Sequence, residues 1–203
     1  MKNVLLTSAG PTPAMVEKIF SVIGKAPRDI KVLFVPTAAV VADEAREGIA
    51  ESFVGLMQLG ILLENITTYH LGYVLSKGYK RTYSAGITDV PAQCRLLTAE
   101  ELSAYDMILV CGGYTDHLMQ EMTRTGFTEP LKAAVENGLF YVGVSAGSMV
   151  AAGNYPEALH FIDNALIPHC PEGTPCGTLP ESEVLLTDGQ AVWITNSGAE
   201  IIE

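Results

Sequence analysis

The sequence has few basic residues and no long hydrophobic run. Its 12 lysines and arginines stand against 23 aspartates and glutamates, and the formal net charge is −11. Nucleic acids and anionic membrane surfaces bind proteins through basic faces, so this balance argues against both partners. No apolar run approaches the roughly 18 residues that a membrane-spanning helix needs. We therefore expect neither nucleic acid nor a membrane as a partner.

Cysteine is also scarce. The four cysteines, at positions 94, 111, 170 and 176, lack the C-x-x-C spacing of many zinc sites. Cys170 and Cys176 are near enough in the sequence to pair, but we favour four free thiols in a cytoplasmic chain. The first residues, MKNVLLTSAGPTPAM, change from apolar to proline-rich too soon for a secretory signal. We expect a cytoplasmic protein with no metal and no other cofactor.

Apolar residues are plentiful, and their arrangement predicts the fold class. They make up 48% of the chain, which shows no repeat, low-complexity run or composition break, so we expect one domain over residues 1–203. Short, continuously apolar runs alternate with helix-like stretches. The predicted strands are 3–8, 31–35, 65–71, 106–110 and 139–144, and the predicted helices are 11–23, 42–59, 116–123 and 129–137. Short β-like pieces around Asp188-Gly189 and Asn196-Ser197-Gly198 predict hairpins.

Continuously apolar strands are buried on both faces of a sheet. The pattern therefore predicts an α/β fold of three layers, with a mostly parallel sheet and helices on both faces. Ligands of such sheets bind beyond the carboxyl ends of the strands. The turns that follow residues 106–110 and 139–144 are therefore the expected place of a site.

Ser145 lies in one of these turns, within the stretch GVSAG at residues 143–147. Gly-x-Ser-x-Gly between a strand and a helix is the nucleophile-elbow pattern, in which a sharp turn leaves the serine hydroxyl exposed. Short matches also arise by chance, and the alternative is a small residue at a tight turn. A nucleophilic serine needs a general base, and the base needs an orienting acid.

His169 is the best candidate base. It ends an apolar segment and has a proline directly before it and another two residues after it, so its backbone is restricted. A turn histidine without a role is the alternative. His70 and His160 are expected to be structural or surface residues, and His117, after the Gly112-Gly113 turn, is the reserve candidate.

Asp188 is the candidate acid because it lies in a loop between two apolar segments. The alternative is an ordinary Asp-Gly hairpin turn. An oxyanion hole needs backbone N–H groups aimed at the reacting carbonyl oxygen. The N–H of Ala146, directly after the serine, is one candidate, and the Gly112-Gly113 turn offers the other at Gly113.

These residues carry a family likeness. The matching segments, in the same order over nearly the whole chain, are 35–38 (VPTA), 106–118 (DMILVCGGYTDHL), 142–149 (VGVSAGSM), 167–169 (IPH) and 186–192 (LTDGQAV). The chain resembles the aspartyl dipeptidase (peptidase E) and cyanophycinase family of serine peptidases. The resemblance implies a flavodoxin-like fold similar to class I glutamine amidotransferases. It also implies that Ser145 is the nucleophile, His169 the base and Asp188 the acid, with oxyanion donors at Gly113 and Ala146.

The chain departs from the family pattern at several positions. The glycine-rich turn, usually Gly-Gly-Gly-Asn-Thr followed by an aromatic residue, reads CGGYTD at 111–116, and the residue after the histidine is Cys170 rather than an aromatic. Glu181 competes for the role of acid because it follows Leu-Pro, as the acid does in the aspartyl dipeptidases. We weigh the segment after Asp188 more heavily.

The sequence thus predicts a dipeptidase-type serine peptidase that acts on a small peptide substrate. An esterase or amidase on the same scaffold, or a non-catalytic relative that keeps the fold, are the alternatives. The oligomeric state is not set by the sequence, and a homodimer is left open.

Overall fold

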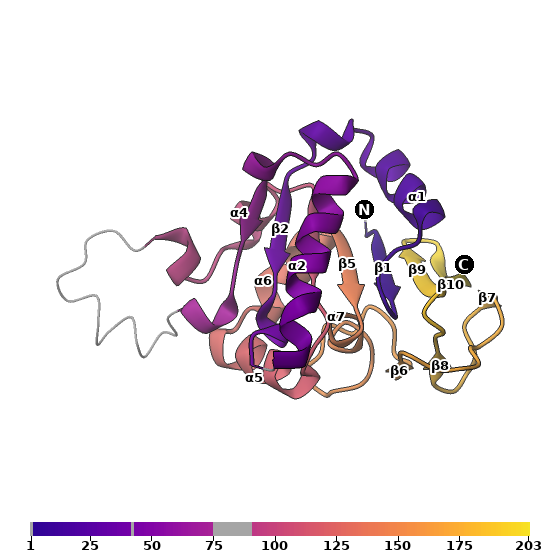
Figure 1. Cartoon of the computed structure of the whole chain (residues 1–203). Helices are drawn as coiled ribbons and strands as arrows, with labels where there is room; N and C mark the ends of the chain where they lie inside the picture. Colours follow the sequence, from indigo (N-terminus) through magenta and orange to yellow (C-terminus); the bar gives the residue numbers. More distant parts are fainter. Residues whose placement is uncertain (1, 42, 75–90) are drawn as a thin grey trace.

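The computed structural model describes residues 2–41, 43–74 and 91–203, and its centre is a sheet of eight strands (Figure 1). The strands lie in the order β3-β2-β4-β5-β1-β9-β10-β7. Their bounds are β1 Val4–Thr7, β2 Val32–Val35, β3 Ile66–Thr68, β4 Met107–Val110, β5 Phe140–Val144, β7 Gly177–Thr178, β9 Ala191–Thr195 and β10 Gly198–Ile202. The pairings from β3 to β1 are parallel, and those from β1 to β7 are antiparallel.

The central strands are short and buried on both faces, as their unbroken apolar runs predict. In β1, Val4 and Leu6 pack into the core on one side of the sheet, and Leu5 packs into the core on the other. All three side chains are fully buried. Side chains alternate across a strand, so a central strand covered by helices on both sides must be apolar at every position.

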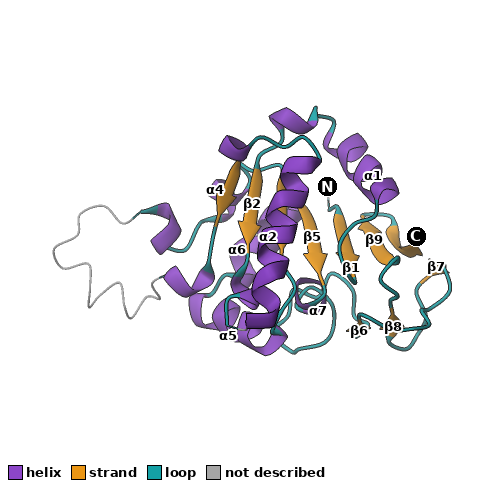
Figure 2. Ribbon diagram, in the orientation of Figure 1, coloured by secondary structure: helices purple, strands orange, loops and turns teal. Residues whose placement is uncertain are grey.

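Helices cover both faces (Figure 2). Helices α1 (Pro13–Ile23) and α2 (Asp43–Gln58) pack on the face that holds Leu5. Helices α4 (Ala99–Leu102), α5 (Thr115–Thr125), α6 (Thr128–Glu136) and α7 (Ala146–Met149) pack on the other. The 3-10 helices are η1 Pro27–Asp29, η2 Thr37–Ala39, η3 Leu63–Asn65, η4 Leu71–Tyr73 and η5 Ala92–Cys94. The predicted three-layer α/β fold is confirmed.

Two local predictions are wrong. Strand β8 (Val184–Leu185) pairs in parallel with β6 (Leu166–Ile167) and not with β9, so there is no hairpin at Asp188-Gly189. The predicted strand 65–71 is shorter, and its last part belongs to η4, with His70 as the N-cap residue. The hairpin at Asn196-Ser197-Gly198 is present, between β9 and β10.

All four cysteines are free thiols. Within the described residues, the helices are too short or too polar to span a bilayer.

Candidate functional site

Ser145 follows β5 directly and occupies a strained turn. Its backbone dihedrals are φ 48° and ψ −106°, and it is the N-cap residue of α7. Positive φ is rare for a residue with a Cβ, and such strain is concentrated at functional sites. The N–H of Ser145 donates to the carbonyl of Thr7 (3.0 Å), which ties the turn to the neighbouring strand β1.

Buried contacts hold this turn in shape. A Cβ on Gly147 would lie 2.2 Å from the carbonyl oxygen of Val110, so only glycine allows α7 to approach β4 so closely. The hydroxyl of Tyr141 donates to the carbonyl of Gly147 (2.6 Å), and the hydroxyl of Ser148 donates to that of Thr7 (2.7 Å). The GVSAG spacing therefore reflects a packed strand-to-helix turn.

The three residues named from the sequence as nucleophile, base and acid lie in contact. His169 Nε2 is 3.0 Å from Ser145 Oγ, and His169 Nδ1 is 2.7 Å from Asp188 Oδ1. His169 follows β6 and has a φ of 59°, and Asp188 lies in a tight turn between β8 and β9. The network assigns a proton to Nδ1, which leaves Nε2 to accept from the serine hydroxyl.

Ser8 was not singled out from the sequence, yet it contacts two of these residues. It follows β1 and is fully buried. Its hydroxyl donates to Asp188 Oδ1 (2.8 Å), and its oxygen accepts the backbone N–H of His169 (2.7 Å). The hydrogen bond from Ser8, followed by that from His169, lowers the pKa of Asp188 below its ordinary value. The available signal was a hydroxyl at the carboxyl end of a buried central strand.

The other candidates lie elsewhere. Glu181 is exposed, in a loop held by Asn164 through the carbonyls of Pro180 (2.9 Å) and Ser182. His160 lies 3.1 Å from the carbonyl of Pro156. Among the described residues, neither Glu181 nor His117 has a hydrogen bond to the Ser145–His169–Asp188 group.

Gly113 lies in the turn after β4 and lines the same pocket as Ser145. Its φ is 132°, and a Cβ there would lie 2.4 Å from the carbonyl oxygen of Ala38. That carbonyl accepts the N–H of Tyr114 (2.8 Å). Within the described residues, the N–H groups of Gly113 and Ala146 donate to no other protein group, so both remain free for a ligand.

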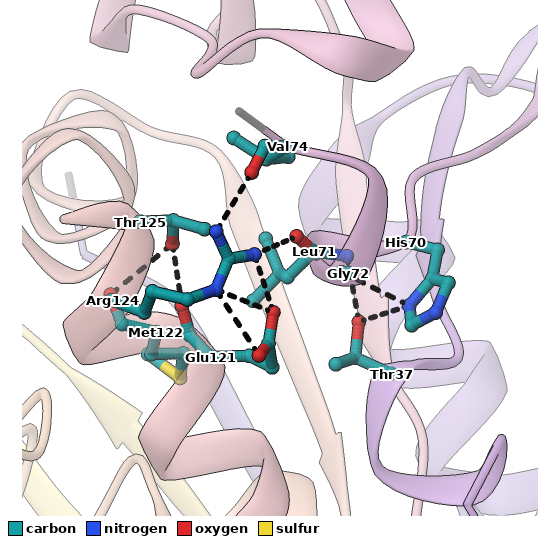
Figure 3. Close-up of polar contacts among 9 residues, drawn as sticks. All are labelled: Thr37, His70, Leu71, Gly72, Val74, Glu121, Met122, Arg124 and Thr125. Atoms are coloured by element: carbon teal, nitrogen blue, oxygen red, sulfur yellow. Dashed lines mark hydrogen bonds and ion pairs between the residues drawn. The ribbon is translucent and has the colours of Figure 1, made fainter. Parts of the chain in front are cut away.

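The 3-10 helix η2, whose Ala38 lies against Gly113, is held by a polar cluster around Thr37 (Figure 3). The hydroxyl of Thr37, in η2, accepts the N–H of Leu71 (2.9 Å) and lies 3.2 Å from His70 Nδ1. Arg124 of α5 donates to the carbonyls of Leu71 (2.9 Å) and Val74 (3.0 Å). Burial lowers the pKa of His70, which favours the neutral imidazole. This histidine is structural, as expected.

The site opens into a pocket of about 980 Å³ whose lining includes Ser8, Gly113, Ser145 and His169. The imidazole of His169 is 51% exposed and the Asp188 side chain 65%, so a substrate can reach them from solvent. A smaller pocket of about 230 Å³ lies beside Asn3 and other residues away from Ser145.

Cys111 also lines the larger pocket, but its chemistry differs from that of Ser145. Burial raises the pKa of its thiol to about 12. A neutral thiol is a weak nucleophile, so Cys111 does not compete with the serine. Within residues 2–41, 43–74 and 91–203, no three His, Cys, Asp or Glu side chains are grouped as metal ligands.

A family model and two relatives that match this chain are all of peptidases. The sequence model of peptidase family S51 matches residues 88–202, more than half of the chain. An uncharacterized peptidase of Pasteurella multocida is 38% identical over 68 residues, which are 32% of this chain and 33% of that protein. An uncharacterized peptidase of Listeria monocytogenes is 27% identical over 190 residues, covering 83% of this chain and 78% of that protein.

Two solved structures share the fold. A Listeria monocytogenes protein assigned to peptidase E has a TM-score of 0.66 at 22% identity, with 100% of this chain and 98% of that chain covered. A peptidase from an acI-B1 actinobacterium has a TM-score of 0.61 at 19% identity, with 100% and 87% covered. At these identities the likeness concerns the fold alone.

Proposed function

The chain belongs to peptidase family S51, and we propose that it is a serine dipeptidase whose catalytic triad is Ser145, His169 and Asp188. The observation that carries the proposal is the unbroken run of contacts through one imidazole. Ser145 Oγ lies 3.0 Å from Nε2, and Asp188 Oδ1 lies 2.7 Å from Nδ1. Both distances suit direct proton transfer and orientation of the ring.

The proposed reaction is acyl transfer to the serine. Ser145 Oγ attacks the peptide carbonyl carbon, and its proton passes to His169 Nε2. Asp188 holds the imidazolium that forms. The imidazolium then gives the proton to the leaving amine, the C–N bond breaks, and an ester to Ser145 remains. Water, deprotonated by the same imidazole, hydrolyses the ester and frees the serine.

Gly113 and Ala146 would stabilise the tetrahedral intermediate. Their N–H groups have no acceptor among the described residues, and a developing oxyanion would supply one. A preorganised donor of this kind contributes about 10²- to 10³-fold to the rate. The preference for dipeptides rests on the resemblance to peptidase E in the motifs around these residues.

A fluorophosphonate probe tests the nucleophile directly because it reacts only with an activated serine. We expect the intact chain to be labelled once, with the adduct on Ser145 by peptide mass spectrometry. Ser145→Ala should be unlabelled and should not hydrolyse dipeptides, apart from a residual rate on the order of 10³-fold above water. Normal turnover by a folded Ser145→Ala variant would disprove the assignment. Comparing dipeptides with matched esters separates a peptidase from an esterase.

A further inference from the structure

The pocket at Ser145 continues as a trench between α1 and α2. Its floor includes the buried side chains of Leu109 in β4 and Val142 in β5, and its sides include Ile19 of α1 and Leu56 of α2. Met107 and Leu109 of β4 and Cys111, the residue after the strand, all line the trench. From the first to the last of them the chain rises about 13 Å at 3.3 Å per residue, and the trench extends that far along the strand. An unbranched apolar group could lie in it with its reactive end at the serine.

Two glycines in α2 make the trench wider. Gly48 and Gly55 both line it, and a Cβ built on either would meet no atom within 4 Å. Neither glycine is therefore required by packing or by a special backbone conformation. Glycine weakens a helix interior, so its use at two positions on one face sacrifices stability. What these positions provide is open volume in the pocket that Ser145 and His169 also line.

Charge at the trench is of one sign. Its lining includes Glu17 of α1 and Glu44, Glu47 and Glu51 of α2, and no lysine or arginine among the described residues. The spacing of three and four residues puts the α2 glutamates on one helix face. All four are exposed, so they lie toward the mouth rather than the apolar floor. Helix α2 begins at the edge of the sheet where Ser145 lies, and Glu44 and Glu47 are in its first two turns (Figure 1).

The nearest basic residues on these helices are engaged elsewhere. Arg46 of α2 forms an exposed ion pair with Asp43 (2.9 Å). Lys18 of α1 lies 3.4 Å from Glu200 and 4.3 Å from the centre of the Trp193 ring. Neither lines the trench, and neither neutralises its glutamates.

We infer that the trench binds a substrate side chain with a positive charge at the end of an apolar stem, as in lysine or arginine. The inference rests on the proposed function of Ser145. The glutamates alone would be an ordinary solvated surface, but they share one pocket with the nucleophile, its base and an apolar floor. Lysine and arginine cover apolar surface with their methylenes and keep the charge in water. A carboxylate side chain would meet four like charges in a cleft that concentrates their field.

Matched dipeptides test the inference with the intact chain. Residue X is lysine, norleucine or glutamate, in X-Ala and in Ala-X, and amine release gives kcat/KM at low ionic strength. Norleucine keeps the stem of lysine and removes the charge. At one of the two positions we expect kcat/KM for the lysine dipeptide to exceed that for the norleucine dipeptide by about tenfold, and kcat/KM for the glutamate dipeptide to be the lowest. The preference for lysine should shrink as salt is added.

Variants then locate the effect. An exposed ion pair changes binding by roughly 2- to 5-fold, so Glu44→Gln with Glu47→Gln should lower kcat/KM for lysine about tenfold and leave norleucine unchanged. The matched control is Glu129→Gln, an exposed glutamate of α6 on the opposite face of the sheet. Gly48→Leu should fill the trench, raise the melting temperature, and lower kcat/KM for lysine and norleucine alike.

The outcomes separate this inference from the proposed function. If the fluorophosphonate does not label Ser145, the proposed function fails first. If Ser145 is labelled but lysine is no better than norleucine or glutamate, the substrate inference is overturned and the nucleophile stands. Labelling without hydrolysis of any lysyl dipeptide, or an unaltered preference in the double glutamine variant, overturns it as well.

Discussion

Ser8 and Asp188, 180 residues apart in the sequence, are joined by a 2.8 Å hydrogen bond from the serine hydroxyl to Asp188 Oδ1. Ser8 Oγ in turn accepts the backbone N–H of His169 (2.7 Å). Ser8 is fully buried, whereas 65% of the Asp188 side chain is exposed. A rigid residue at the end of β1 thus fixes both an exposed carboxylate and the backbone that carries the imidazole.

Ser8→Ala should lower kcat roughly 10- to 100-fold, the cost of losing a hydrogen bond to a charged group. KM should change little, because Ser8 orients Asp188 and His169 rather than the substrate. The hydrogen bond from Ser8 is the main reason that the pKa of Asp188 is low, so this pKa should rise in the variant. The loss of activity on acidification should then start at a higher pH. The measurement is kcat and KM across pH, with circular dichroism to check folding.

A suitable control for this variant is Thr125→Val. Thr125 is also buried, but its hydroxyl donates to the carbonyl of Glu121 (2.7 Å) within α5. An equal loss of kcat in this variant, or an unchanged pH profile in Ser8→Ala, would assign Ser8 a purely structural role.

Asp188→Asn should reduce the rate by up to about 10⁴-fold, because an amide favours the wrong imidazole tautomer while it keeps the geometry. Glu181→Gln should leave the rate within about twofold, since Glu181 has no hydrogen bond to the imidazole among the described residues. Steady-state hydrolysis by both variants is the measurement. The reverse ranking would transfer the role of acid to Glu181.

Gly113→Ala should abolish measurable hydrolysis and lower the melting temperature. The new methyl carbon would lie 2.4 Å from the Ala38 carbonyl oxygen, so the turn must move, and an oxyanion donor moves with it. Gly138→Ala is the control: φ is 114° there, and a Cβ meets no atom within 4 Å. Gly138→Ala should cost about 1–3 kcal/mol of stability from strain and retain full activity. Retained activity in Gly113→Ala would contradict the proposed oxyanion hole.

Acid should weaken the fold through Glu101. Hydrogen bonds from Arg95, followed by the N–H of Thr98, lower the pKa of Glu101 from 4.5 to about 2. Because its pKa is lower in the folded chain, its stabilising contribution is complete above pH 4.5 and disappears as the pH falls toward 2. Thermal unfolding should show a smaller change over that window in Glu101→Gln than in the unaltered protein. Glu100→Gln, exposed on the same helix, should resemble the unaltered protein.

The fold was predictable because each part of its signal is local. A central strand such as β4 needs an apolar residue at every position, and that run is visible without knowing which strands it pairs with. The turn at Ser145 was visible for a similar reason, since Gly147 must be glycine to approach the Val110 carbonyl. The family assignment, drawn from motifs in order along the chain, is confirmed.

Contacts between distant segments were not predictable in the same way. Strands β6 and β8 have two residues each, too few for a periodic pattern. Because β8 pairs with β6 and not with β9, the turn at Asp188 connects two different sheets and does not close a hairpin. Ser8 looks like the polar end of a buried strand until Asp188 is placed beside it. The catalytic roles of Ser145, His169 and Asp188 remain predictions that the variants above test.

The position of β1 in the sheet determines when the site can form during protein synthesis. β1 pairs with β5, which leads to Ser145, and with β9, which follows the turn that holds Asp188. A ribosome makes the serine and the histidine well before β9 can leave the exit tunnel. On the proposed mechanism, a nascent chain therefore holds a nucleophile without its acid. The complete triad of the proposed mechanism therefore forms only after β9 has paired with β1.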